Sequence, residues 1–344
     1  MRSIVLLQFT FYFLIFLKSS ICLGAPFIID PILGDQLQRV QLSDPQSKMT
    51  VFWWNVQEGF SHLSADGSTN YLSENLRRLV HGFYAPELIV LGEYGPQVER
   101  VLTSHTKKAL HENYPFQGFV SYSNSEPHLG FKYFSKHPIS DSFVDLLDWV
   151  PKEMSKEQKE ELRKLWAQRM VQSKNILSQY FRISMEVKGK TYHFVPVHLS
   201  HPWRYFSQLG RDRGYFEKYD IFKEIAFGKN NPNYGQLSNL LEAIQKDLLP
   251  LSNHEKLILM GDFNIPSDYG VAIGYRLLRK YFTDPYQDID APTFPSLNAQ
   301  GAALGTPVKI DHVFSLRKET VSNPVILPLK GSDHYPLWFQ IELN

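Results

Sequence analysis

The chain has one cysteine among its 344 residues and almost no net charge, and these shortages exclude several classes of protein. A single thiol, Cys22, cannot form a disulfide framework or a thiolate metal site. Lys plus Arg number 36 and Asp plus Glu 35, so a uniformly basic nucleic-acid-binding protein is not indicated. The 20 Gly and 21 Pro form no low-complexity tract, and 43% hydrophobic with 21% charged residues is typical of a globular chain. The length suits one large domain or two average ones.

The start of the chain has the pattern of an export signal. Arg2 precedes the apolar run Ile4–Leu17, and the small residues Gly24 and Ala25 follow it. The run is shorter than the ~20 residues that span a bilayer, so we predict a cleaved signal peptide over residues 1–24 rather than a retained anchor. We therefore expect an exported protein, periplasmic or secreted, with no transmembrane span in the mature chain.

After a leader over residues 25–48, strand-like runs alternate with amphipathic segments, which is typical of an α/β domain. No linker divides the rest, so we predict one domain over residues 49–344. Strands are predicted at Met49–Asn55, Glu87–Leu91, Phe116–Tyr122, Gly130–Phe134, Phe181–Val187, Tyr192–Val197, Lys256–Met260, Val308–Phe314 and Leu337–Leu343. Helices are predicted at Glu74–Phe83, Val98–Asn113, Ser155–Gln179, Leu237–Leu248 and Gly270–Tyr281. Gly189 predicts a hairpin turn between two of the strands.

Polar side chains recur where the predicted strands stop. These residues are Asn55, Glu93, His198, Asp262, Asn264, Asp311, Asp333 and His334. In layered α/β proteins such strand ends carry the active site, because a rigid sheet positions side chains that touch a ligand. Carboxylate and amide oxygens suit Mg²⁺, Mn²⁺ or Ca²⁺. Asn55 or Glu93 alone could instead cap a turn or a helix, and Gly261–Asn264 could be a simple Asx turn, so the hypothesis depends on the whole set.

Taken in order, the motifs resemble those of the endonuclease/exonuclease/phosphatase superfamily, which includes deoxyribonuclease, apurinic endonucleases, sphingomyelinases and inositol polyphosphate 5-phosphatases. The resemblance extends from about Met49 to the end of the chain. It implies a four-layered α/β sandwich, with two packed, mostly antiparallel β-sheets flanked by helices and a site at one mouth. The segments that carry it are Trp54-Asn55, Glu93, Ser135–Ile139, Val197–Leu199, Gly261–Asn264, Ile310–Phe314 and Gly331–Pro336.

The resemblance also implies a divalent metal site. Glu93 would ligate the ion, and Asn55 and Asp333 would complete its surroundings directly or through water. Mg²⁺ is the expected ion, with Mn²⁺ or Ca²⁺ as alternatives.

Five further residues take catalytic roles by the same resemblance. His334 would be the general base or the group that polarises the phosphate, and Asp311 would orient it. Asp262 would align the attacking water, Asn264 would bind a phosphate oxygen, and His198 would donate to the phosphate or the leaving group. A carboxylate partner keeps an imidazole in one tautomer and raises its basicity, which makes these roles reasonable.

The sequence departs from the family pattern at several points. Gly92 precedes Glu93 where many relatives have Gln, and Gln57 stands where some nucleases of the family have an acidic residue, which favours one metal over two. Insertions are predicted near residues 152–180 and 200–235. The second interleaves aromatic and basic residues, beginning His201-Pro202-Trp203-Arg204. It could stack on a nucleobase, meet a lipid headgroup, cover the site, or pack as an ordinary surface loop.

These observations lead us to expect an exported, monomeric, Mg²⁺-dependent phosphoesterase. Phosphodiesters are favoured over monoesters, and the substrate classes are nucleic acid, phospholipid or another small phosphate. The alternatives are a phosphomonoesterase and a non-catalytic binding module on the same fold.

Overall fold

The computed structural model describes residues 47–59, 63, 67–82, 85–123, 126–146, 155–157, 159–160, 179–199, 232–267, 272–294, 308–317 and 320–343. The predicted signal peptide, nearly all of the leader and most of both predicted insertions lie outside these ranges. Within the described residues, no helix combines the length and apolar character needed to cross a membrane.

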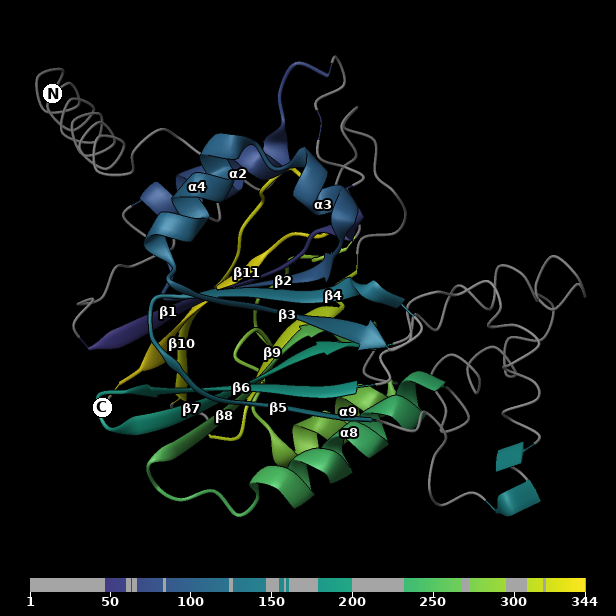
Figure 1. Cartoon of the computed structure of the whole chain (residues 1–344). Helices are drawn as coiled ribbons and strands as arrows, with labels where there is room; N and C mark the ends of the chain where they lie inside the picture. Colours follow the sequence, from purple (N-terminus) through teal and green to yellow (C-terminus); the bar gives the residue numbers. More distant parts are fainter. Residues whose placement is uncertain are drawn as a thin grey trace, which may run out of the picture.

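Two β-sheets pack face to face (Figure 1). The six-stranded sheet has the order β10 (Val321–Ile326), β11 (Leu337–Glu342), β1 (Lys48–Asn55), β2 (Leu88–Tyr94), β4 (Glu126–Ser135), β3 (Phe116–Ser123). The five-stranded sheet has the order β5 (Ile139–Leu146), β6 (Gln179–Val187), β7 (Lys190–His198), β8 (Glu255–Asp262), β9 (Asp311–Ser315). Each sheet contains one parallel pair, β1–β2 and β7–β8, and its other neighbours are antiparallel.

Helices cover the outer faces of both sheets and complete four layers (Figure 1). The helices α2 (Tyr71–His81), α3 (Pro96–Val101) and α4 (Ser104–Asn113) lie on the six-stranded sheet, after the short 3₁₀ turn η2 (Gln57–Gly59). The helices α8 (Pro232–Leu248) and α9 (Ile273–Tyr281) lie on the five-stranded sheet. The predicted four-layered α/β sandwich with mostly antiparallel sheets is therefore confirmed.

Strand β1 shows why its residues form a central strand. Val51 and Trp53 point into the core between the sheets, whereas Phe52 and Trp54 point into the core beneath α2, α3 and α4. Successive side chains of a strand face opposite sides, so a strand covered on both faces is apolar at every position. All four of these side chains are fully buried.

The structure corrects two sequence-based expectations about its elements. The helix predicted over Val98–Asn113 is two helices. Helix α3 ends at Val101, and the side chain of Thr103 caps a new helix by accepting the backbone N–H of Thr106. Gln179, predicted to be the last residue of a helix, is instead the first residue of β6. Residues 161–178 of that predicted helix lie outside the described ranges.

Two strands were not predicted, and both are edge strands. In β5, whose sequence is ISDSFVDL, polar residues interrupt the apolar ones and Val144 is exposed. In β10 the pairing with β11 shifts register between Ser322 and Val325, around Pro324. Edge strands carry few buried side chains and tolerate proline, so their hydrophobic pattern is weak.

Candidate active site

The strand ends that carry polar residues meet at one edge of the sandwich. Strands β1 and β2 run parallel, which places Asn55 opposite Gly92, the residue before Glu93 in β2. Strands β7 and β8 also run parallel, with His198 opposite Asp262, and β9 begins with Asp311 opposite the same aspartate. Strand register within each sheet therefore groups residues that are far apart in the chain.

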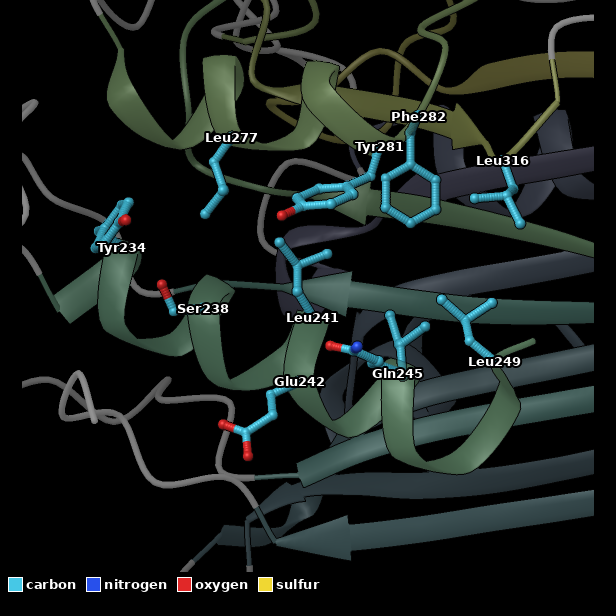
Figure 2. Close-up of a pocket in the computed structure, with 11 residues that line it drawn as sticks. Tyr234, Ser238, Leu241, Glu242, Gln245, Leu249, Leu277, Tyr281, Phe282 and Leu316 are labelled. Carbon is cyan, nitrogen blue, oxygen red and sulfur yellow. The ribbon is translucent and has the colours of Figure 1, made fainter. Parts of the chain in front are cut away.

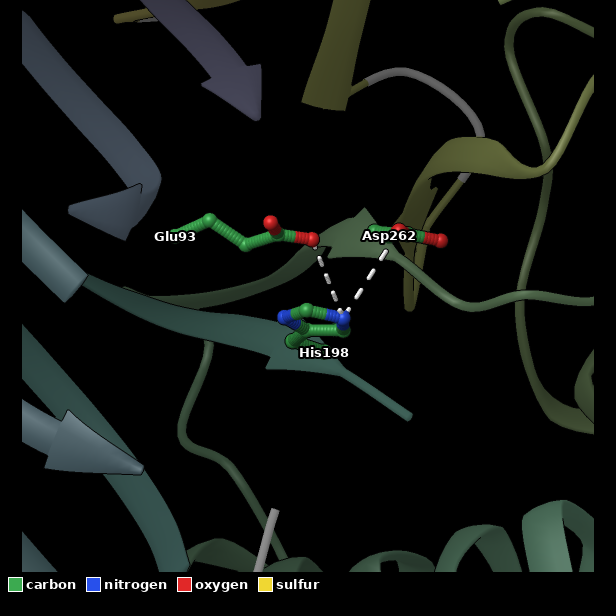
Figure 3. A group of neighbouring side chains, drawn as sticks. All are labelled: Glu93, His198 and Asp262. Carbon is green, nitrogen blue, oxygen red and sulfur yellow. Dashed lines mark ion pairs between the residues drawn. The ribbon is translucent and has the colours of Figure 1, made fainter. Parts of the chain in front are cut away.

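Glu93, His198 and Asp262 form the centre of this cluster, with Glu93 contributed by one sheet and the other two by its partner (Figure 3). The Nε2 atom of His198 lies 3.7 Å from Oε1 of Glu93 and 3.8 Å from Oδ2 of Asp262. The amide nitrogen of Asn55 donates to both carboxylates, at 3.0 Å to Glu93 and 3.2 Å to Asp262. Its Oδ1 accepts the backbone N–H of Gln57 at 3.1 Å, which fixes the orientation of the amide.

His334 and Asp311 form a buried pair beside this centre. Nδ1 of His334 lies 2.7 Å from Oδ2 of Asp311, the shortest contact of either histidine with a carboxylate in the cluster. The opposite ring nitrogen, Nε2, lies 3.8 Å from Oδ2 of Asp262 and 3.9 Å from Oδ1 of Asp333. One nitrogen is thus committed to Asp311 while the other faces the site, the arrangement that gives an imidazole a defined tautomer.

The turn after β8 serves the fold and the site at once. Oδ1 of Asp262 accepts the backbone N–H of Asn264 at 2.9 Å, so the Asx-turn interpretation of this motif is correct. Its Oδ2 remains directed at Asn55 and the two histidines. The amide of Asn264 donates to the carbonyl of Leu199 at 2.8 Å and thereby ties this turn to the end of β7.

The sequence-based prediction missed three side chains that hydrogen-bond to the site residues Asp311, His334 and Glu93. Nε1 of Trp53 donates to Oδ1 of Asp311 at 3.2 Å, and Nε1 of Trp54 donates to the carbonyl of His334 at 2.9 Å. The hydroxyl of Tyr122 accepts the backbone N–H of Glu93. Aromatic residues in strands are typical of a core, so only the proximity of the two tryptophans to Asn55 could have suggested this role.

Burial and crowding of like charges shift the pKa values of the cluster. Burial raises the pKa of Asp262 well above its ordinary value, and the charges of Asp311 and Glu93 raise it further against the effect of His334. Burial also raises the pKa of Asp333 to about 6, with a contribution from Glu93 and an opposing one from His334. Burial lowers the pKa of His334, but Asp311 and Asp333 outweigh it and place that pKa well above 6.5.

These residues fit a divalent cation by their chemistry. Ligand atoms of Glu93, His198 and Asp262 lie within 4.8 Å of one another, as do those of Asp262, Asp311 and His334. Buried carboxylates that raise one another's pKa are costly without a counter-charge, and hard oxygen donors suit Mg²⁺, Mn²⁺ or Ca²⁺. The assignment of Asn55, Glu93 and Asp333 as the metal-binding residues stays a prediction. In the structure the amide nitrogen of Asn55, not its oxygen, faces the carboxylates.

A cavity of about 380 Å³ lies elsewhere, between α8 and α9 (Figure 2). Its walls are mainly apolar, with Leu241, Leu277 and Phe282 among them, and none of the predicted site residues lines it. The polar cluster at the strand ends is therefore the candidate active site.

Comparison with known proteins gives a family match for most of the chain. The model of the Endonuclease/Exonuclease/phosphatase family matches residues 52–334, a span that includes all eight predicted site residues. A search of curated protein sequences finds no significant match.

Several solved structures share the fold at low sequence identity. An endonuclease/exonuclease/phosphatase from Beutenbergia cavernae is 14% identical, with a TM-score of 0.53 over 87% of this chain and 72% of that one. A family protein from Bacteroides thetaiotaomicron is 14% identical, with a TM-score of 0.54 over 87% of this chain and 99% of that one. A mannosyl-6-phosphatase from Bacteroides thetaiotaomicron is 14% identical, with a TM-score of 0.53 over 85% of this chain and 98% of that one.

Proposed function

The chain belongs to the endonuclease/exonuclease/phosphatase family, and on that premise we propose that it is a divalent-metal-dependent hydrolase that cleaves a phosphate ester by attack of an activated water. The observation that carries the proposal is the buried pair of His334 and Asp311, in which Nδ1 of His334 lies 2.7 Å from the carboxylate. The other ring nitrogen of His334, Nε2, faces Asp262 and Asp333. Hydrolysis of a phosphate ester needs neutralisation of the phosphate charge, an aligned nucleophile and help for the departing oxygen. The cluster contains groups for each task.

Glu93 would ligate the cation, and Asn55 and Asp333 would complete its surroundings directly or through water. When bound, the ion supplies charge neutralisation for the phosphate oxygens. The chain's own residues then bind, orient and move protons. Asn264, at the turn after β8, is the proposed donor to a phosphate oxygen.

Two imidazoles flank one carboxylate oxygen, which supports a division of acid and base roles. Nε2 of His334 and Nε2 of His198 each lie 3.8 Å from Oδ2 of Asp262. We assign Asp262 to aligning the water, His334 to accepting its proton or polarising the phosphate, and His198 to donating toward the leaving group. Such acid–base help is worth about 10²- to 10⁴-fold in rate.

We further propose that the enzyme is exported, acts as a monomer and prefers phosphodiesters. The predicted signal peptide supports export. A proton donor such as His198 would assist the alkoxide leaving group that diesters and monoesters both release, so the test below decides between the two. A phosphomonoesterase is the second candidate, and the fold shared with a mannosyl-6-phosphatase is the reason to test it.

The test is hydrolysis of bis(4-nitrophenyl) phosphate and of 4-nitrophenyl phosphate by purified protein lacking residues 1–24, with Mg²⁺, Mn²⁺ or Ca²⁺ and with EDTA. We expect metal-dependent release of nitrophenolate from the diester at the higher kcat/KM. Faster cleavage of the monoester would establish the second candidate. A folded protein inactive on both substrates with every ion would contradict the proposal.

A second panel identifies the natural class of substrate. It contains plasmid DNA, RNA, sphingomyelin and other phospholipids, sugar phosphates and inositol phosphates, each with and without Mg²⁺. Activity on DNA that falls steeply with salt would identify a nuclease, because each phosphate contact releases counterions.

A further inference from the structure

Tyr122 contacts both halves of the candidate site from a distant strand. It belongs to β3, the edge of the six-stranded sheet, and its side chain is 1% exposed. Its hydroxyl accepts the backbone N–H of Glu93. Its ring packs edge-on against the imidazole of His198, with centroids 4.9 Å apart and planes at 89°. One side chain therefore contacts the proposed metal ligand of one sheet and the proposed acid of the other.

Glu93 needs such a partner because its backbone is strained. Its φ is +50°, a left-handed conformation that residues other than glycine rarely adopt. The pairing of β2 with β4 shifts register between Leu91 and Tyr94, so Glu93 lies in a bulge. A bulge re-aims a side chain at the cost of ladder hydrogen bonds, and here the N–H of Glu93 is satisfied by a phenol from β3.

The bulge decides where the carboxylate of Glu93 points. Side chains alternate between the faces of a strand, so regular pairing would turn this residue away from its present direction. Strained conformations persist only where the surroundings over-determine them. The phenol of Tyr122 is a contact that regular pairing would not provide.

The ring of Tyr122 packs against His198, the second site residue that Tyr122 contacts. An edge-to-face contact at this distance restricts rotation of the His198 imidazole. The restricted ring places Nε2 at 3.7 Å from Glu93 and 3.8 Å from Asp262.

We propose that Tyr122 is a positioning residue that keeps Glu93 aimed at the metal site and His198 at a fixed distance from it. The proposal rests on the function proposed above for these two residues. Partners of this kind typically change metal affinity or activity by about 10- to 100-fold when they are removed.

Two substitutions separate the two contacts. Tyr122→Phe deletes the hydroxyl that holds Glu93 and keeps the ring on His198, whereas Tyr122→Leu deletes both. Tyr114→Phe is the matched control, because Tyr114 is also fully buried and its hydroxyl donates to the carbonyl of Pro86 at 2.9 Å in the core beneath the helices.

The readouts are Mn²⁺ affinity by electron paramagnetic resonance, the His198 ring signals in histidine-labelled protein, assigned with His198→Gln, and kcat and KM for the diester. We expect Tyr122→Phe to weaken Mn²⁺ binding about 10-fold and to lower kcat more than it raises KM, with the His198 signals retained. We expect Tyr122→Leu to shift those signals as well, because the ring current of the phenol is lost. Tyr114→Phe should leave all three readouts at wild-type values.

Wild-type Mn²⁺ affinity in Tyr122→Phe, with a loss of thermal stability equal to that of Tyr114→Phe, would overturn the proposal. So would unchanged His198 signals in Tyr122→Leu. A wild-type protein that binds Mn²⁺ but hydrolyses no phosphate ester would instead contradict the proposed function, and the binding and spectroscopic readouts would still decide the role of Tyr122.

Discussion

At the scale of single residues, the candidate site combines carboxylates whose negative charges repel one another with imidazoles that can compensate those charges. Asp262 and Asp333 have raised pKa values because they are buried close to Glu93 and, for Asp262, to Asp311. The pKa of His334 is raised because two carboxylates outweigh its burial. Perturbed titration of several neighbouring groups is a common mark of an active site.

His334 gives the sharpest test of the catalytic assignment. We expect His334→Ala to lower kcat for the diester at least 100-fold, because the proposed base, which Asp311 orients, is lost. Thermal unfolding and circular dichroism check that the fold is intact. A folded variant with near-normal turnover would remove His334 from the mechanism.

The raised pKa values also fix the sign of a pH effect. For Asp333, a folded pKa of about 6 against an ordinary 3.8 means that the native state binds the proton more tightly than the unfolded state. Its contribution to stability is present at low pH and is lost as the pH rises from about 4 through about 6. Asp262 and His334, also raised, act in the same direction.

Protons and a divalent cation therefore compete for the same carboxylates. We expect the increase in melting temperature caused by Mg²⁺ over EDTA to grow between pH 5 and pH 8. The increase should shrink in Asp333→Asn, which has one carboxylate fewer. A Mg²⁺ effect that is equal at both pH values would show that the ion binds elsewhere.

At the scale of elements, strand pairing places the site, and glycine makes one pairing possible. Gly261 in β8 has a φ of +152°, and a Cβ atom there would lie 1.9 Å from the carbonyl oxygen of Val197 in β7. This close approach holds His198 opposite Asp262. Glycine at position 261 is therefore needed both for the pairing of β7 with β8 and for the geometry of the candidate site.

We expect Gly261→Ala to cost about 3 kcal/mol or more in the free energy of unfolding and to reduce activity in the protein that still folds. Gly189→Ala is the control, because Gly189 also has a positive φ, +73°, but nothing lies within 4 Å of an added Cβ. Backbone strain alone should cost the control about 1 kcal/mol. Urea denaturation measures both, and equal costs would argue against the steric explanation.

The sequence predicted the central elements better than their boundaries and edges. Buried strands such as β1 and β8 are apolar runs that end at a polar site residue, so both their position and their role were visible. The break between α3 and α4 could not be seen in the sequence, because apolar residues keep their helical spacing through Leu102. The start of the second helix depends on a single side-chain cap, that of Thr103. Strands β5 and β10 lacked a clear pattern because they are edges.

The predicted site residues converge at one edge, yet their support could not be foreseen. Asn55, Glu93 and His198 were visible because polar residues at strand ends need an explanation. Trp53 and Tyr122 were not, because a buried aromatic side chain in a strand is typically explained by packing alone. Their polar atoms acquire a role only once register places them beside Asp311 and Glu93.

At the scale of the whole molecule, the site joins the two sheets. Glu93 comes from the six-stranded sheet, and His198 and Asp262 come from the five-stranded sheet. A cation bound by ligands from both sheets would stabilise the folded chain, because it binds the folded chain and not the unfolded one.

We expect EDTA to lower the melting temperature of the wild type and to have a smaller effect on Glu93→Gln. An equal effect on both would place the ion outside this site.

The position of β11 has a consequence for biosynthesis. This strand lies between β10 and β1, and His334 precedes it by three positions in the chain. A nascent chain synthesised only as far as β10 therefore still lacks its proposed base and leaves β1 unpaired along one side. Hydrolysis at the proposed site would therefore require β11 to be synthesised and docked, and we expect a chain that ends before His334 to lack this activity.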